Sequence, residues 1–83
     1  MSSQVEYLFA ATVALADQAA RKQGWRPRGR ADWLKPDGTV VCFICLAEQL
    51  AIVPAGTTVH FVGKEPAELR RLKRICTLVA LAA

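Results

Sequence analysis

Arginine and tryptophan side chains gather in one short segment of this 83-residue chain. Residues 24–30 read Gly-Trp-Arg-Pro-Arg-Gly-Arg, and the Gly and Pro residues predict a loop rather than a helix. Guanidinium groups bind phosphate or carboxylate through paired hydrogen bonds, and indole rings stack on nucleobases. Arg and Trp are also enriched at the energetic centres of protein–protein interfaces. We therefore predict a partner-binding surface formed by Trp25, Arg26, Arg28, Arg30 and the nearby Trp33. The alternative is that both Trp residues pack in the core or on the hairpin and that the Arg residues are only solvated.

A second basic segment lies in residues 64–74, where apolar side chains recur at helical spacing. Positions 70 and 74 are neighbours on a helix surface, so the cations there form a wide band that suits a phosphate backbone. The band consists of Arg70, Arg71, Lys73 and Arg74. A solvated helix face explains the same pattern without a partner. Because the chain carries a net charge of +4, the two basic segments predict an acidic partner, either a nucleic acid or an acidic protein surface.

Three Cys residues and one His could supply zinc ligands, but their surroundings favour a structural role. Cys42 and Cys45 lie in an apolar run, and residues three apart in a strand point to opposite faces. One metal ion cannot easily take both thiolates, and a buried Cys behaves as a small hydrophobic side chain. His60 has no recognisable nucleophile or acid partner in the sequence. We expect no metal, no cofactor and no catalytic residue, so the chain is predicted not to be an enzyme.

Two helices are expected near the ends of the chain. Residues 4–23 combine helical spacing of apolar side chains with a capping-box pair, Ser3 and Glu6. Pro66 favours the start of a second helix, which carries the basic band. The segment Ile75–Ala83 is apolar on all sides. It is expected either to form a late strand or to continue the helix with a second face packed on a partner.

Strands are expected between the two helices. Pro36-Asp37-Gly38 predicts the turn of a β-hairpin, and the strand at 39–46 is apolar on both faces. Residues 57–62 predict a further strand, whereas 47–53 fit a short helix or a strand. The sequence therefore predicts one small α+β domain over residues 1–83, in α-β-β-β-α order. Its three-stranded antiparallel sheet would lie between an N-terminal and a C-terminal helix.

Composition indicates a folded, cytoplasmic protein. Apolar residues make up 53% of the chain, which argues against disorder. No apolar run approaches the roughly 18 residues of a membrane span, and the N-terminus lacks the basic region of a signal peptide. An odd number of Cys residues fits a reducing compartment. The high apolar content also suggests that some surface is covered by a partner or by a second copy, and Ile75–Ala83 is the candidate interface for a homodimer.

The expected element order resembles that of double-stranded-RNA-binding domains, as an analogy of fold alone. In length and Ala/Arg-rich composition, the chain resembles small phage and mobile-element inhibitors of the anti-CRISPR type. This resemblance implies a non-enzymatic protein that binds and inhibits or modulates a nucleic-acid-handling complex. Two alternatives remain beside it: a direct nucleic-acid-binding module, and a homodimeric assembly or adaptor protein.

Overall fold

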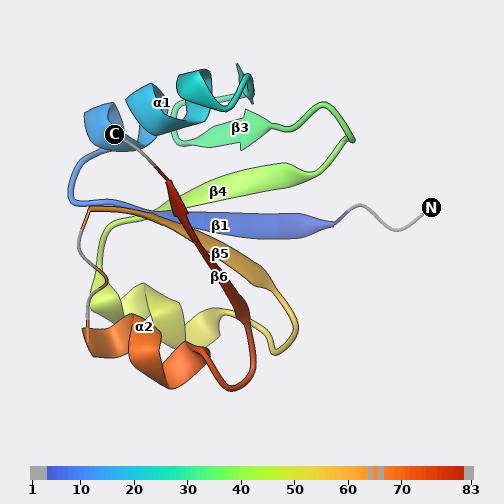
Figure 1. The fold of residues 1–83 in the computed structure, drawn as a ribbon. Helices are drawn as coiled ribbons and strands as arrows, with labels where there is room; N and C mark the ends of the chain where they lie inside the picture. The colour runs from blue at the N-terminus through green and yellow to red at the C-terminus, as the bar shows by residue number, and fades with distance from the viewer. Residues whose placement is uncertain (1–3, 64, 66, 82–83) are drawn as a thin grey trace.

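A six-stranded mixed β-sheet organises the computed structural model, which describes residues 4–63, 65 and 67–81 (Figure 1). The strands are β1 (Val5–Phe9), β2 (Arg26–Pro27), β3 (Asp32–Leu34), β4 (Val40–Ile44), β5 (Thr58–Val62) and β6 (Thr77–Leu81). They lie in the order β2-β3-β4-β1-β5-β6. Neighbours from β4 to β6 are parallel, whereas β2 and β3 extend the sheet in antiparallel fashion. The helices are α1 (Val13–Lys22), the 3-10 helix η1 (Ala47–Ile52) and α2 (Ala67–Leu72).

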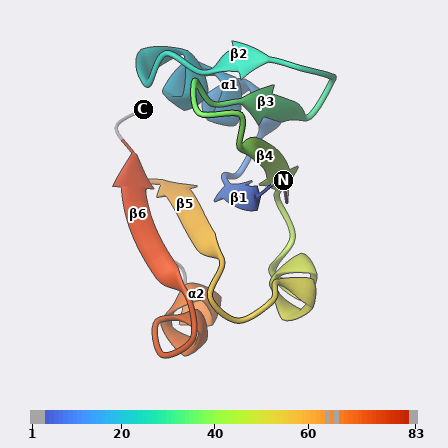
Figure 2. The same ribbon diagram turned by 90° about the vertical axis from the view of Figure 1, so that its right-hand side faces the viewer.

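Helices cover both faces of this sheet (Figure 2). Helix α1 covers one face, and η1 and α2 cover the other. Strand β1 contributes side chains to the core on both faces of the sheet. Leu8 packs on the α1 side, and Tyr7 and Phe9 pack on the side of η1 and α2. The buried residues on the α1 side are Leu8, Ala10, Ala16, Ala19, Ala20, Trp25, Trp33, Val41 and Leu81. Those on the other side are Ile44, Leu50, Val53, Val59, Phe61, Leu69 and Leu72.

The expected helix over residues 4–23 is wrong in its first part. Val5–Phe9 forms β1, the central strand, which pairs with both β4 and β5. Its β-branched and aromatic residues suit a strand that is covered on two faces. The helix begins only at Val13, where the hydroxyl of Thr12 accepts the backbone N–H of Leu15 at 3.2 Å. Ser3, half of the expected capping box, lies outside the described residues.

The expected three-stranded antiparallel sheet between two terminal helices is also wrong. Strand β5 matches the expected strand at 57–62, but it is parallel to both of its neighbours. Helix α2 ends at Leu72, and the apolar segment after it forms the edge strand β6 rather than a longer helix. The segment 47–53 fitted either a helix or a strand, and residues 47–52 of it form η1. The expected helix start at Pro66 lies outside the described residues.

The hairpin turn at residues 36–38 is confirmed, and it joins β3 to β4. The backbone N–H of Lys35 donates to the carbonyl of Thr39 at 2.9 Å. The carboxylate of Asp37 accepts the N–H of Thr39 at 2.9 Å, and Gly38 has a φ of +91°. Pro, Asp and Gly therefore fix this turn by local chemistry, as the sequence predicts.

Candidate partner-binding site

The β2–β3 hairpin places three exposed arginines at one edge of the sheet. Arg26 lies in β2 opposite Leu34, and Arg28 and Arg30 follow in the connecting loop. The Arg28 guanidinium lies 3.5 Å from the carboxylate of Asp32. Within the described part of the chain, no carboxylate pairs with Arg26 or Arg30. Their charges are therefore available to a partner.

The loop of this hairpin is closed tightly around Asp32. The backbone N–H of Arg28 donates to the carbonyl of Asp32 at 3.0 Å. The Asp32 carboxylate lies directly against Gly29, in the space that a Cβ atom would take, so a larger residue at position 29 would displace this carboxylate. The loop thus holds Arg28 and Arg30 in a defined turn at the sheet edge.

The two tryptophans of the predicted surface are core residues, since Trp25 is 7% and Trp33 is 2% exposed. Trp33 Nε1 donates to Asp17 Oδ1 at 3.1 Å and ties β3 to α1. This hydrogen bond, followed by that from Arg21, lowers the pKa of Asp17. The Trp25 ring meets His60 edge-on, with 4.8 Å between ring centroids. Neither indole offers a face for stacking on a partner.

Four side chains from β1, β5, the loop after α1 and the end of β3 contact one another. We call them the Glu6 cluster: Glu6, Trp25, Lys35 and His60. Oxygen Oε1 of Glu6 lies 3.1 Å from Lys35 Nζ and 2.7 Å from His60 Nε2. The Lys35 ammonium also lies 5.8 Å from the centroid of the Trp25 ring, within cation–π range. The cluster fixes Lys35, and with it the end of β3, against β1 and β5.

The protonation state of His60 follows from its burial. Burial lowers the pKa of His60 from its ordinary value of 6.5, although the hydrogen bond and charge of Glu6 oppose that shift. A neutral ring that donates Nε2–H to Glu6 leaves Nδ1 with a lone pair. Nδ1 is buried and has no hydrogen-bond partner among the described residues. Because Nδ1 is sealed from solvent, His60 acts as a structural donor to the Glu6 carboxylate and not as an accessible base.

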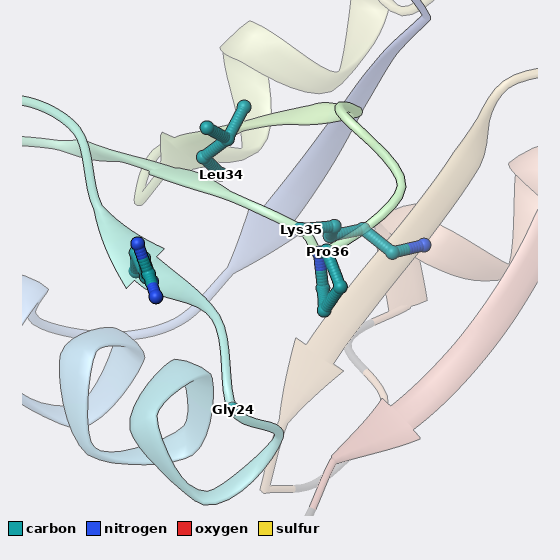
Figure 3. Close-up of a pocket in the computed structure, with 5 residues that line it drawn as sticks. Gly24, Leu34, Lys35 and Pro36 are labelled. Carbon is teal, nitrogen blue, oxygen red and sulfur yellow. The ribbon is translucent and has the colours of Figure 1, made fainter.

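A pocket of about 400 Å³ opens between the loop after α1 and the β3–β4 turn (Figure 3). Its lining combines cations with apolar groups: Gly24, Arg26, Leu34, Lys35 and Pro36. Figure 3 shows Gly24 across the opening from Pro36, with Lys35 directed toward β5. A carboxylate entering here would meet Arg26 at the rim, while its carbon chain would contact Leu34 and Pro36.

The second basic segment lies elsewhere on the molecule. Arg70, Arg71 and Arg74 line a shallow hollow of about 360 Å³ at α2. Lys73 Nζ pairs with Glu65 at 3.1 Å. Figures 1 and 2 show the β2–β3 hairpin and α2 at opposite ends of the protein, the hairpin at one edge of the sheet and α2 against one of its faces. The two basic segments therefore form two separate surfaces.

Sequence reasoning missed the Glu6 cluster. The sequence offers no signal for it beyond a His in an alternating strand and a Glu in an apolar segment, because parallel pairing of β1 and β5 creates the contact. The structure brings Lys35 to the rim shared with Arg26, and Lys35 was not among the predicted site residues.

Neither a cluster of metal ligands nor a membrane-spanning helix is found in residues 4–63, 65 and 67–81. In those residues, no three His, Cys, Asp or Glu side chains gather closely enough to hold a metal ion. Burial raises the pKa of the Cys42 thiol, as expected for a structural Cys. None of the helices in that part of the chain is long and apolar enough to cross a bilayer.

No protein-family model, curated protein or solved structure matches this chain.

Proposed function

We propose that this protein acts by binding an acidic surface of a partner protein through the β2–β3 hairpin. One observation carries the proposal: Arg26 and Arg30 are exposed and unpaired within the described chain, beside a pocket that Arg26 and Lys35 share. A partner Asp or Glu side chain fits this pocket, and guanidinium–carboxylate pairs are strong and directional. The resemblance in size and composition to small inhibitors points to a nucleic-acid-handling complex as the source of the partner.

A protein partner fits this surface better than a nucleic acid does. Single-stranded nucleic acids are held by aromatic side chains on which bases stack, and both Trp rings are buried. Duplexes are held by cations that follow the phosphate backbone, but the two basic surfaces lie at opposite ends of the molecule. The cations of the β2–β3 hairpin therefore form a small group that matches a few carboxylates on a partner protein.

A matched pair of charge reversals tests the location of the site. The first variant carries Arg26→Glu and Arg30→Glu, and its control carries Arg70→Glu and Arg74→Glu. All four side chains are exposed, and both variants change the net charge equally. The probe is a fluorescent polyglutamate peptide, with binding measured by anisotropy. We expect the hairpin variant to lose at least tenfold in affinity and the control to change little. Loss of binding only in the α2 variant would refute the hairpin site.

A salt series with a fluorescent DNA duplex separates the two classes of partner. Each phosphate that the protein contacts adds roughly 0.9 to the slope of log affinity against log salt. For a site of three arginines, we expect a slope no steeper than about 3. A slope of about 6 or more would show many phosphate contacts and would favour the nucleic-acid-binding module instead.

A further inference from the structure

The two edges of the sheet are protected to very different degrees. Strand β2 has only two residues, Arg26 and Pro27, and a charged residue and a proline both discourage a further strand. Strand β6 has five residues, Thr77–Leu81, with no charge and no proline. No described element pairs with its outer side (Figure 2). An apolar edge without such protection is a template for another strand.

The backbone of β6 has a defined set of groups that face outward. The N–H of Thr77 donates to the carbonyl of Thr57 at 3.1 Å, so the backbone of Thr77 faces β5. Backbone direction alternates along a strand, and Val79 and Leu81 therefore also face β5. The N–H and C=O groups of Leu78 and Ala80 point away from the sheet. They are symmetric about Val79.

We propose that β6 pairs in antiparallel fashion with β6 of a second copy, about a two-fold axis at Val79. In this register, Leu78 of one copy exchanges both ladder hydrogen bonds with Ala80 of the other, and the reverse pair does the same. Every outward backbone group of Leu78 and Ala80 gains a partner. Val79 then faces its own symmetry mate as a non-hydrogen-bonded pair. A strand that complements itself in this way gives a closed, isologous dimer.

Charge and side chains favour a second copy as the occupant. The strand itself is uncharged, so two positively charged chains can meet there. Antiparallel pairing places the two α2 arginine groups at opposite ends of a strand pair about 17 Å long. That separation exceeds the Debye length of about 8 Å at physiological salt, so their repulsion is screened. Leu78 and Val79 are half-buried, and Ile75, just before the strand, is exposed. All three lose apolar exposure in the dimer.

Substitutions at Ala80 test the dimer without breaking the protomer. Ala80 is exposed, and in the register of β5 with β6 its N–H points away from β5 and makes no hydrogen bond to it. The variants are Ala80→Pro, which removes an outward donor, and Ala80→Lys, which adds an edge charge. Ala51→Lys, at an exposed site on η1, is the control with the same added charge. Light scattering across two decades of concentration gives the mass, and circular dichroism checks the fold.

We expect the mass of the parent chain and of the Ala51→Lys control to rise toward twice 9.1 kDa with concentration. Both Ala80 variants should remain monomers with an unchanged circular dichroism spectrum. A parent chain that stays monomeric at the highest concentration would overturn the proposal. So would a dimer that both Ala80 variants leave intact.

A disulfide trap tests the register independently. Non-hydrogen-bonded antiparallel pairs bring Cα atoms to about 4.5 Å, within the range of disulfide geometry. In a Cys45→Ser background, which removes the exposed thiol, Val79→Cys should form an interchain disulfide under mild oxidation. Ala51→Cys in the same background should not. Equal cross-linking of both variants would indicate random collision and contradict the register.

Discussion

His60 Nε2 lies 2.7 Å from Glu6 Oε1, although the two residues are 54 positions apart. The contact crosses from β5 to β1 on the α1 side of the sheet, where Lys35 reaches the same Glu6 oxygen. Three segments of the chain thus meet at one carboxylate. Stability is expected to depend on this carboxylate more than on the solvated ion pairs at the surface.

The neutral state of His60 makes stability depend on pH. Because burial lowers its pKa below 6.5, the unfolded chain binds a proton over a pH range in which the folded chain does not. We expect the free energy of unfolding to fall as pH drops below about 6.5 and to keep falling until the folded pKa is reached. Urea unfolding at a series of pH values measures this slope.

His60→Gln is the control for that slope, since its amide can still donate to Glu6 but does not titrate. Its stability should be flat across the same pH range. The pKa values of Asp17 and Asp37 are lowered from 3.8, so their contributions are lost only in more acidic solution. An unchanged slope in His60→Gln would show that another group titrates.

Removing the Glu6 carboxylate should destabilise the fold. Glu6→Leu leaves the Lys35 ammonium and the His60 N–H without their acceptor in a largely buried place. We expect the free energy of unfolding to fall by about 2 kcal/mol, because a buried polar group without a hydrogen-bond partner has lost its water without compensation. Adding Lys35→Met should restore part of the loss. If Glu6→Leu unfolds at the same urea concentration as the parent chain, the cluster has no structural role.

The bond between Trp33 and Asp17 should be visible in a carboxyl titration. Trp33→Phe removes the indole donor while keeping an aromatic ring in the core. Because that donor is the main cause of the lowered pKa of Asp17, the pKa should rise toward 3.8 in the variant. NMR of the Asp17 carboxyl carbon measures it. Arg21→Ala removes both a hydrogen bond and a nearby positive charge and should also raise the pKa of Asp17. An unchanged pKa of Asp17 in Trp33→Phe would contradict the role of the indole donor.

The β3–β4 turn should tolerate only some replacements of Gly38. Its φ of +91° is a conformation that Gly adopts at no steric cost. Gly38→Ala should cost about 1 kcal/mol in the free energy of unfolding, and Gly38→Asn should cost less, because Asn tolerates positive φ. Thermal unfolding of both variants measures the difference. Equal stability of Gly38→Ala and the parent chain would contradict this account.

Features set by neighbouring residues could be predicted from the sequence. The turn at Pro36-Asp37-Gly38 follows from three adjacent residues, and the apolar run at 39–46 contains β4. Strand β1 was missed because its apolar positions at 5, 8 and 9 fit a helical spacing continued into α1. Its true environment depends on β4 and β5, which lie far along the chain.

The candidate site was predictable only in its charges. The predicted loop at 24–30 is interrupted by β2, but Arg26 in that strand and Arg28 and Arg30 after it are all exposed. Composition could not show that Trp25 and Trp33 turn inward, because the same indoles serve cores and interfaces equally well. Nor could it bring Glu6 to His60, since that pairing exists only after parallel strands have assembled.

The position of β1 has a consequence for the order of folding events. It precedes the other described strands in the chain, yet its two partners are β4 and β5, which end at Ile44 and Val62. No N-terminal fragment that stops before residue 58 contains both neighbours of this strand. Local hairpins can form early, but the parallel centre must wait for loop closures that are slow to achieve. Folding of this unit should therefore be cooperative, because its central strand gains both neighbours only when the chain as far as β5 has returned to it.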